Sequence, residues 1–291
     1  MTVDFCGIEL ANPIINASGT FDAVAAGRVF GARLHDEFPF AAFVTKTVTN
    51  APREGNPPPR LWELAGGLLN SIGLPNKGIE RFLAEDLPRL AQLPVPTIVN
   101  VMGFSRGEVA ELTAALEDRD EASAIELNVS CPNVETGMTM GADPHELALL
   151  LHHVRPVTSK PLIVKLTPNA SDVSAVARAA QDGGADAVSL INTLRGMALH
   201  PVTGASWLGG RTGGVSGPSV RAIALAQVDS VRRAIDLPIV GIGGVQRGCD
   251  ALDLLRAGAT LVAVGTESFR DPAAGRRIAW ELEGLLANSP V

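Results

Sequence analysis

The sequence predicts an α/β fold, specifically a (β/α)8 TIM barrel with a short N-terminal hairpin and loops inserted at the carboxyl-terminal face of the strands. Eight short apolar runs, many of them rich in β-branched residues, alternate with longer amphipathic stretches. No Gly-rich dinucleotide or P-loop fingerprint is present, which disfavours the alternative of an open doubly wound sheet. The chain has 291 residues, of which 46% are hydrophobic, so it can bury one large core. We therefore expect a single domain over residues 1–291.

The elements follow one another along the chain. The first ten residues are compatible with a hairpin. The predicted strands are residues 13–17, 41–47, 97–101, 124–129, 162–166, 187–191, 238–242 and 261–264. Helical patterns cover residues 79–93, 107–117, 144–154, 173–181, 220–235 and 251–257, with Ser105 and Ser171 as candidate N-caps. The connections 50–76 and 193–218 are unusually long, so we expect lids or additional small elements there.

Charge and cysteine content exclude several classes of function. The net charge of −7 disfavours a nucleic-acid surface, and a small ligand or a protein partner fits better. The three cysteines are far apart and have neither disulfide-framework nor zinc-ligand spacing, which suggests a reducing, cytoplasmic location. No segment approaches the roughly 18 apolar residues of a membrane span.

Polar groups stand at the carboxyl ends of the predicted strands, the face that carries catalytic residues in TIM barrels. The first six strands deliver Ser18, Lys46, Thr47, Asn100, Asn128, Cys131, Lys165, Asn192 and Thr193. The seventh and eighth strands are followed by Gly243, Gly244, Gly265 and Thr266. Glycines in these two loops allow backbone amides to approach a phosphate, so we expect a phosphate-bearing ligand. The alternative is that they only end the strands tightly, which we prefer for Gly265 taken alone.

Lys46 and Lys165 lie in or at the end of apolar strands, where a charge is costly unless it is paired. The chain has only four lysines among its 24 basic residues, so two ammonium groups at strand ends indicate a specific need. They could offset negative charge on a bound ring or form a Schiff base; a structural ion pair is the alternative. Asparagine amides suit a flat heterocycle with carbonyl and N–H groups, although a single asparagine is more often a turn cap.

Cys131 stands between Asn128 and Asn133 and just beyond the end of the fourth predicted strand. A thiol can act as a base when its surroundings stabilise the thiolate. No histidine is near it in the sequence, which disfavours a protease-like pair, and the five histidines form no metal-ligand pattern. We interpret Cys6 and Cys249 as small buried residues without a catalytic role.

Together these motifs resemble class 1 dihydroorotate dehydrogenases, flavoenzymes of pyrimidine biosynthesis. The similarity covers nearly the whole chain, in Asn12-Pro13-Ile14, Val44-Thr45-Lys46-Thr47, Gly55-Asn56-Pro57, Leu69-Asn70-Ser71-Ile72-Gly73-Leu74, Asn128-Val129-Ser130-Cys131-Pro132-Asn133, Val164-Lys165-Leu166, Ile191-Asn192-Thr193 and Gly241-Ile242-Gly243-Gly244-Val245. The chain looks most similar to the 1B branch, in which this chain would be the catalytic subunit.

The resemblance implies one FMN per chain and oxidation of dihydroorotate to orotate, with the proton passing to Cys131 and the hydride to FMN. Lys165 would stabilise the reduced, anionic flavin. Dihydroorotate would contact Lys46, Asn70, Ser71, Ile72, Gly73, Leu74, Asn128, Asn133, Asn192 and Thr193. FMN would be held by Ser18, Lys46, Thr47, Asn100, Asn128, Lys165, Ile191, Gly217, Gly243, Gly244, Gly265 and Thr266.

The resemblance to the 1B branch also implies a partner. Members of this branch pass electrons to NAD through a separate subunit that carries FAD and a [2Fe-2S] cluster, and the present chain has no cysteine cluster of its own for iron and sulfur. We expect a homodimer, or a heterotetramer with that subunit. Met138-Thr139-Met140 departs from the pattern of the branch, which leaves a fumarate-using 1A activity as the alternative.

Other functions are compatible with parts of the pattern. Another FMN-dependent pyrimidine oxidoreductase would share much of the site, whereas the charge of −7 disfavours a tRNA dihydrouridine synthase. A Schiff-base aldolase would use Lys165 as its reactive amine. A non-catalytic ligand-binding barrel gives no reason for a thiol among amides.

Overall fold

The computed structural model describes residues 2–130 and 141–288. Eight strands form one parallel sheet in the order β3-β14-β13-β10-β9-β8-β7-β4, which confirms the predicted TIM barrel. The strands are β3 (Ile14–Asn16), β4 (Phe43–Val44), β7 (Thr97–Val101), β8 (Ala124–Asn128), β9 (Leu162–Lys165), β10 (Ala187–Leu190), β13 (Ile239–Ile242) and β14 (Leu261–Val264). All eight predicted strands are present, and β4 is shorter than the predicted 41–47.

The barrel closes between β3 and β4 without a regular backbone ladder. The Asn16 side chain bridges the two strands: its Oδ1 accepts from Val44 N at 2.9 Å and its Nδ2 donates to Val44 O at 2.8 Å. Ala41 N also donates to Ile14 O at 2.9 Å. A side-chain amide therefore takes the place of a backbone partner at this junction.

Alternate residues of the strands face two separate apolar layers. One layer lies between the strands and the surrounding helices and includes Val99, Leu127 and Val164. The other fills the inside of the barrel and includes Ile98 and Ile163. A strand buried on both faces reads as a continuous apolar run, and this is why the strands could be found in the sequence.

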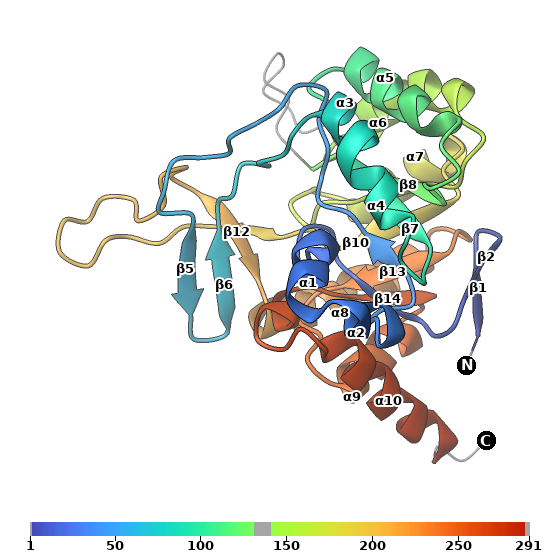
Figure 1. The fold of residues 1–291 in the computed structure, drawn as a ribbon. Coiled ribbons are helices and arrows are strands. Elements are labelled where there is room, and N and C mark those ends of the chain that lie inside the picture. The colour runs from blue at the N-terminus through green and yellow to red at the C-terminus, as the bar shows by residue number, and fades with distance from the viewer. Residues whose placement is uncertain (1, 131–140, 289–291) are drawn as a thin grey trace.

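The helices follow the strands in chain order (Figure 1). They are α1 (Ala23–Phe30), α2 (Ala32–Asp36), α3 (Ile79–Arg81), α4 (Leu87–Leu90), α5 (Arg106–Glu117), α6 (Pro144–Val154), α7 (Val173–Asp182), α8 (Arg221–Arg232), α9 (Gly248–Arg256) and α10 (Ala274–Ala287). Short π or 3₁₀ segments are η1 (Phe82–Asp86), η2 (Arg155–Val157), η3 (Pro218–Val220) and η4 (Thr266–Phe269). The sequence patterns predicted none of α1, α2 and α10.

Two details of the predicted helices need correction or refinement. Ser105 caps α5 as expected, since its hydroxyl accepts from Glu108 N. Ser171 does not cap α7; the cap is Asp172, whose carboxylate accepts from Ala175 N. The predicted helix 79–93 is divided into α3, η1 and α4, and Pro88, which has no N–H to donate, lies at the start of α4.

The N-terminal hairpin and a second small sheet lie on opposite sides of the barrel (Figure 1). The hairpin pairs β1 (Val3–Phe5) with β2 (Ile8–Leu10), as predicted, and its Phe5 and Leu10 belong to the apolar layer inside the barrel. The two long connections form a four-stranded antiparallel sheet, here called the accessory sheet. It consists of β5 (Leu61–Leu64), β6 (Gly67–Asn70), β11 (Leu194–Gly196) and β12 (Gly213–Ser216). Among the described residues, no helix has the length and apolar character needed to span a bilayer.

Candidate active site

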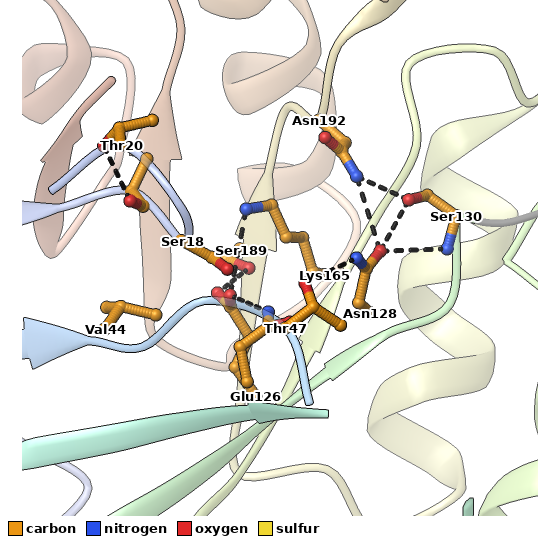
Figure 2. A network of polar contacts seen from close by, with 12 residues as sticks. Ser18, Thr20, Val44, Thr47, Glu126, Asn128, Ser130, Lys165, Ser189 and Asn192 are labelled. Carbon is orange, nitrogen blue, oxygen red and sulfur yellow. Dashed lines mark hydrogen bonds and ion pairs between the residues drawn. The ribbon is translucent and has the colours of Figure 1, made fainter. Parts of the chain in front are cut away.

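Three polar side chains meet at the carboxyl end of the barrel. Asn128 ends β8, and its Oδ1 accepts from the Ser130 hydroxyl at 2.6 Å and from Asn192 Nδ2 at 3.4 Å. Asn192 Nδ2 also donates to Ser130 Oγ, so the three side chains form a triangle (Figure 2). On the other side Asn128 Nδ2 donates to Thr47 Oγ1 at 3.4 Å. Sequence segments that are far apart thus supply one cluster of amides and hydroxyls.

A second polar cluster lies deeper, around the carboxylate of Glu126 in β8. Its Oε1 accepts from Asn100 Nδ2 at 2.6 Å, and its Oε2 accepts from Ser189 Oγ at 2.7 Å. The Lys165 ammonium lies 3.8 Å from Oε1, and Figure 2 shows Lys165 and Ser189 directed toward this carboxylate. The side chains of Glu126 and Lys165 are each only 6% exposed, so this is a buried ion pair supported by hydrogen bonds.

Lys46 is the second ammonium of the site and has no ion pair with a described carboxylate. Burial, followed by the positive charge of Lys165, lowers the pKa of the Lys46 ammonium below its ordinary value. The side chain runs over Gly19, where an added Cβ would come within 2.9 Å of Lys46 Cδ. Two like charges facing one region would be stabilised by an anionic ligand.

The glycines after β13 and β14 differ in whether the surrounding protein leaves room for a side chain. Gly243 and Gly244 have positive φ, and a Cβ at either position would meet α8 within 2.7 Å, at Ala224 or Arg221. Protein packing alone explains these two. A Cβ at Gly265 would meet only Thr20 at 3.7 Å and Ala17 at 3.8 Å, so the protein leaves room there. Neither a close side chain nor a positive φ excludes a Cβ at Gly265.

Gly217 and Thr266 lie beside this region. A Cβ at Gly217 would be 3.6 Å from Thr266 Cγ2, and the Thr266 hydroxyl donates to Ser216 Oγ at 2.9 Å. Ser18 follows β3, and its hydroxyl donates to Thr45 O at 2.8 Å. Ile191 is buried and would lie 3.3 Å from a Cβ placed on Gly243. The predicted cofactor residues therefore come from adjacent loops.

The predicted substrate segment 70–74 belongs to the accessory sheet and the turn that follows it. Asn70 Nδ2 donates to Gly214 O at 3.1 Å, and a Cβ on Gly214 would overlap Thr193 Oγ1. Ser71 is buried and its hydroxyl accepts from Asn56 Nδ2 at 2.8 Å. Within the described residues, no hydrogen bond joins this segment to Asn128 or Asn192. The structure links Asn70 to Thr193 through β12.

Asn100, whose amide bonds to Glu126, carries one of four buried side-chain atoms that lack a hydrogen-bond partner among the described residues. Asn100 is fully buried, and its Oδ1 has no hydrogen-bond partner among the described residues. An unpaired buried acceptor is unfavourable unless something donates to it. A ring N–H would satisfy this oxygen, and the space beside Gly265 would admit a phosphate oxygen. Both features fit the flavin that the sequence resemblance implies.

Sequence reasoning missed Glu126, Ser130 and Ser189. The available signal for Glu126 was that an acidic residue lies inside an apolar strand. Burying its charge is costly, and the same argument identified Lys165.

Cys131 and Asn133 lie outside the described residues. Cys249 was expected to be buried, but it is exposed on α9 because position 249 faces away from the sheet. The described residues contain no group of His, Cys, Asp or Glu side chains arranged to hold a metal ion.

Comparison with known proteins gives a consistent result. The sequence model of the family described as dihydroorotate dehydrogenase matches residues 1–286. A protein of Pelobacter propionicus, named dihydroorotate dehydrogenase B (NAD(+)), catalytic subunit, is 47% identical over 287 residues, which covers 98% of this chain and 93% of the relative. A protein of the same name from Geobacter metallireducens is 44% identical over 292 residues, covering 100% of this chain and 94% of the relative.

Proposed function

The chain belongs to the dihydroorotate dehydrogenase family, and we propose that it is the catalytic subunit of an NAD-linked, B-type enzyme that oxidises dihydroorotate to orotate on the way to UMP. The observation that carries the proposal is the full-length match to B-type catalytic subunits. It is supported by the convergence of two lysines and three asparagines at the carboxyl end of one barrel. Residues 1–291 would act as one FMN-binding domain.

The proposed cofactor is one FMN, which when bound supplies the hydride acceptor. Its ring would be held by Asn100, Lys46 and Lys165, and its phosphate by the backbone near Gly265 and Thr266. Ser18, Thr47, Asn128, Ile191, Gly217, Gly243 and Gly244 would complete the site. The unpaired Asn100 Oδ1 and the room at Gly265 support this assignment.

The residues of this chain would hold the substrate and remove its proton. Forming the ring double bond requires loss of a proton from one carbon and of a hydride from its neighbour. Cys131 would accept the proton, with Asn128 and Asn192 as donors to the substrate carbonyls and carboxylate. Lys46 would place a positive charge near the bound anion, and the anion would offset the burial and the Lys165 charge that lower the pKa of the Lys46 ammonium. Asn70, Ser71, Ile72, Gly73, Leu74, Asn133 and Thr193 would complete the substrate site.

The electrons would leave through a partner chain that carries FAD and a [2Fe-2S] cluster. A homodimer of this chain, or a heterotetramer with that partner, is the proposed assembly. The names of the relatives include the words catalytic subunit, which supports the existence of a second subunit. A fumarate-linked enzyme of the A type is the alternative, because residues 138–140 depart from the B-type pattern.

Purification of the chain alone tests the proposal. We expect a yellow protein with a flavin spectrum that bleaches on addition of dihydroorotate and that oxidises it with an artificial electron acceptor. NAD reduction should require a second, cysteine-rich chain. A protein that stays colourless after incubation with FMN would refute the flavin assignment, and fumarate reduction by the chain alone would favour the A type.

A further inference from the structure

We propose that Glu126 is a positioning residue of the active site: its carboxylate orients the Asn100 amide so that Oδ1 is offered to the bound ring, and it holds the Lys165 ammonium beside that amide. This inference rests on the proposed function, because Asn100 and Lys165 are among the residues expected to hold the flavin. Glu126 itself reaches the ligand only through these two neighbours.

Glu126 and Lys165 stand out in the barrel by their charge. Glu126 is the only acidic residue and Lys165 the only basic residue in the eight strands of the barrel. Glu126 is 4% exposed and Lys165 5% exposed. A buried pair of this kind is weak support for stability, because desolvation offsets much of the attraction. Since the ion pair adds little to the stability of the fold, a role at the ligand site explains its presence better.

The hydrogen bonds of Glu126 determine which way the Asn100 amide faces. An ionised carboxylate only accepts hydrogen bonds, so Asn100 must turn its Nδ2 toward Oε1, at 2.6 Å. The Asn100 carbonyl oxygen is then the group left without a partner. Ser189 donates to Oε2 at 2.7 Å and fixes the plane of the carboxylate. Glutamine at position 126 could both donate and accept, so the Asn100 amide would no longer have one preferred orientation.

The same carboxylate balances the charge of the site. Lys165 lies 3.8 Å from Glu126 Oε1, the oxygen that also accepts from Asn100 (Figure 2). Lys46, Lys165 and Glu126 together carry a net charge of +1 when all three are ionised. Loss of the carboxylate would leave the two ammonium groups without this balancing negative charge, and Lys165 already lowers the pKa of Lys46.

The test compares the single variant Glu126→Gln with an exchange variant that combines Asn100→Asp with Glu126→Gln. In the exchange variant the new amide at position 126 donates to the new carboxylate at position 100. That carboxylate still offers a free oxygen to the ligand, and the negative charge stays within the pair. Glu126→Asp keeps the charge with a shorter side chain. Glu117→Gln, which removes a carboxylate that contacts Thr158 and Ser159, is the matched control.

Thermal unfolding verifies that each variant is folded, and two quantities are then measured. The first, in the proteins that keep Asn100, is hydrogen exchange of the Asn100 side-chain NH2 by NMR in the flavin-free state. We expect it to be at least about tenfold faster in Glu126→Gln, because a hydrogen bond to a charged acceptor is lost. The second is the dissociation constant for FMN, which should rise at least about tenfold in Glu126→Gln. It should return to within about threefold of wild type in the exchange variant.

The outcomes separate this inference from the proposed function. The inference is overturned if Glu126→Gln binds FMN with wild-type affinity and its Asn100 NH2 undergoes hydrogen exchange at the wild-type rate. It is also overturned if Glu126→Gln and the exchange variant lose FMN affinity equally, because packing alone would then explain the loss. If Glu126→Gln does not fold, the exchange variant and the wild type decide. FMN affinity of the exchange variant within about threefold of wild type supports the inference. Asn100 NH2 exchange in the wild type as fast as in free asparagine, or a loss of FMN affinity of about tenfold or more in the exchange variant, overturns it. If the wild-type protein does not bind FMN, the proposed function fails, while Asn100 exchange still tests the orientation.

Discussion

The side-chain amide of Asn16 pairs with both backbone groups of Val44. Oδ1 accepts from Val44 N at 2.9 Å, Nδ2 donates to Val44 O at 2.8 Å, and the Asn16 side chain is fully buried. These contacts join β3 to β4, the two ends of the eight-stranded sheet. This side chain and the backbone bond from Ala41 N to Ile14 O together close the barrel below the loops that carry Ser18 and Lys46.

Asn16→Ala should lower the free energy of unfolding by about 3 kcal/mol, because it leaves a buried N–H and a buried carbonyl of Val44 without partners. Urea unfolding measures the change. Asn288→Ala is the control, since the Asn288 side chain is exposed and donates to Gly284 O at the end of α10. An Asn16→Ala protein as stable as the control would show that backbone contacts alone close the barrel.

Gly265→Ala should fold normally but bind FMN at least about tenfold more weakly, because the methyl group would occupy space that the protein leaves open. Fluorescence titration of the flavin-free protein with FMN measures the affinity. Gly284→Ala is the control: it lies in α10 with nothing within 4 Å and should stabilise the helix by about 0.5–1 kcal/mol without changing affinity. Unchanged FMN affinity in Gly265→Ala would contradict the proposed phosphate position.

Cys131→Ala should retain bound flavin but lose about 10²–10⁴-fold in turnover, because the proposed proton acceptor is absent. Stopped-flow reduction of the flavin by dihydroorotate isolates this step from later electron transfer. Cys249→Ala removes an exposed thiol on α9 and should react at the wild-type rate. Near-wild-type reduction in Cys131→Ala would rule out this cysteine as the base.

Glu117 should give the stability of the protein a measurable dependence on acid pH. Hydrogen bonds from the Ser159 hydroxyl, the Thr158 hydroxyl and Ser159 N lower the pKa of the Glu117 carboxyl to about 2. Because the folded-state pKa is depressed, the contribution is fully present above the ordinary value near 4.5 and is lost as the pH falls toward 2. The group is close to solvent, so we expect about 1 kcal/mol at most.

Unfolding of wild type and Glu117→Gln at pH 6 and at pH 3 measures this contribution. The wild type should be the more stable protein at pH 6, and the difference should shrink at pH 3. A difference that does not depend on pH would show that the charge of Glu117 is unimportant.

The accessory sheet illustrates what the sequence could not provide. The connections 50–76 and 193–218 were recognised as too long for simple loops, but their pairing could not be predicted. Strands β6 and β12 are separated by more than 140 residues and meet through contacts such as Asn70 Nδ2 to Gly214 O. Pairing over that distance depends on where the barrel places the two connections, which is not a local property.

The sequence by itself determined the eight strands and the polar groups at their ends, because buried parallel strands are continuous apolar runs and a charge within such a run is conspicuous. It also predicted Lys165 and Asn100 as site residues. Only the tertiary structure decided that Glu126 contacts both of them, that a Cβ at Gly265 would meet no close neighbour, and that Asn16 bridges β3 and β4. Each of these depends on which atoms of distant segments come within hydrogen-bond or van der Waals distance, and no local pattern encodes that.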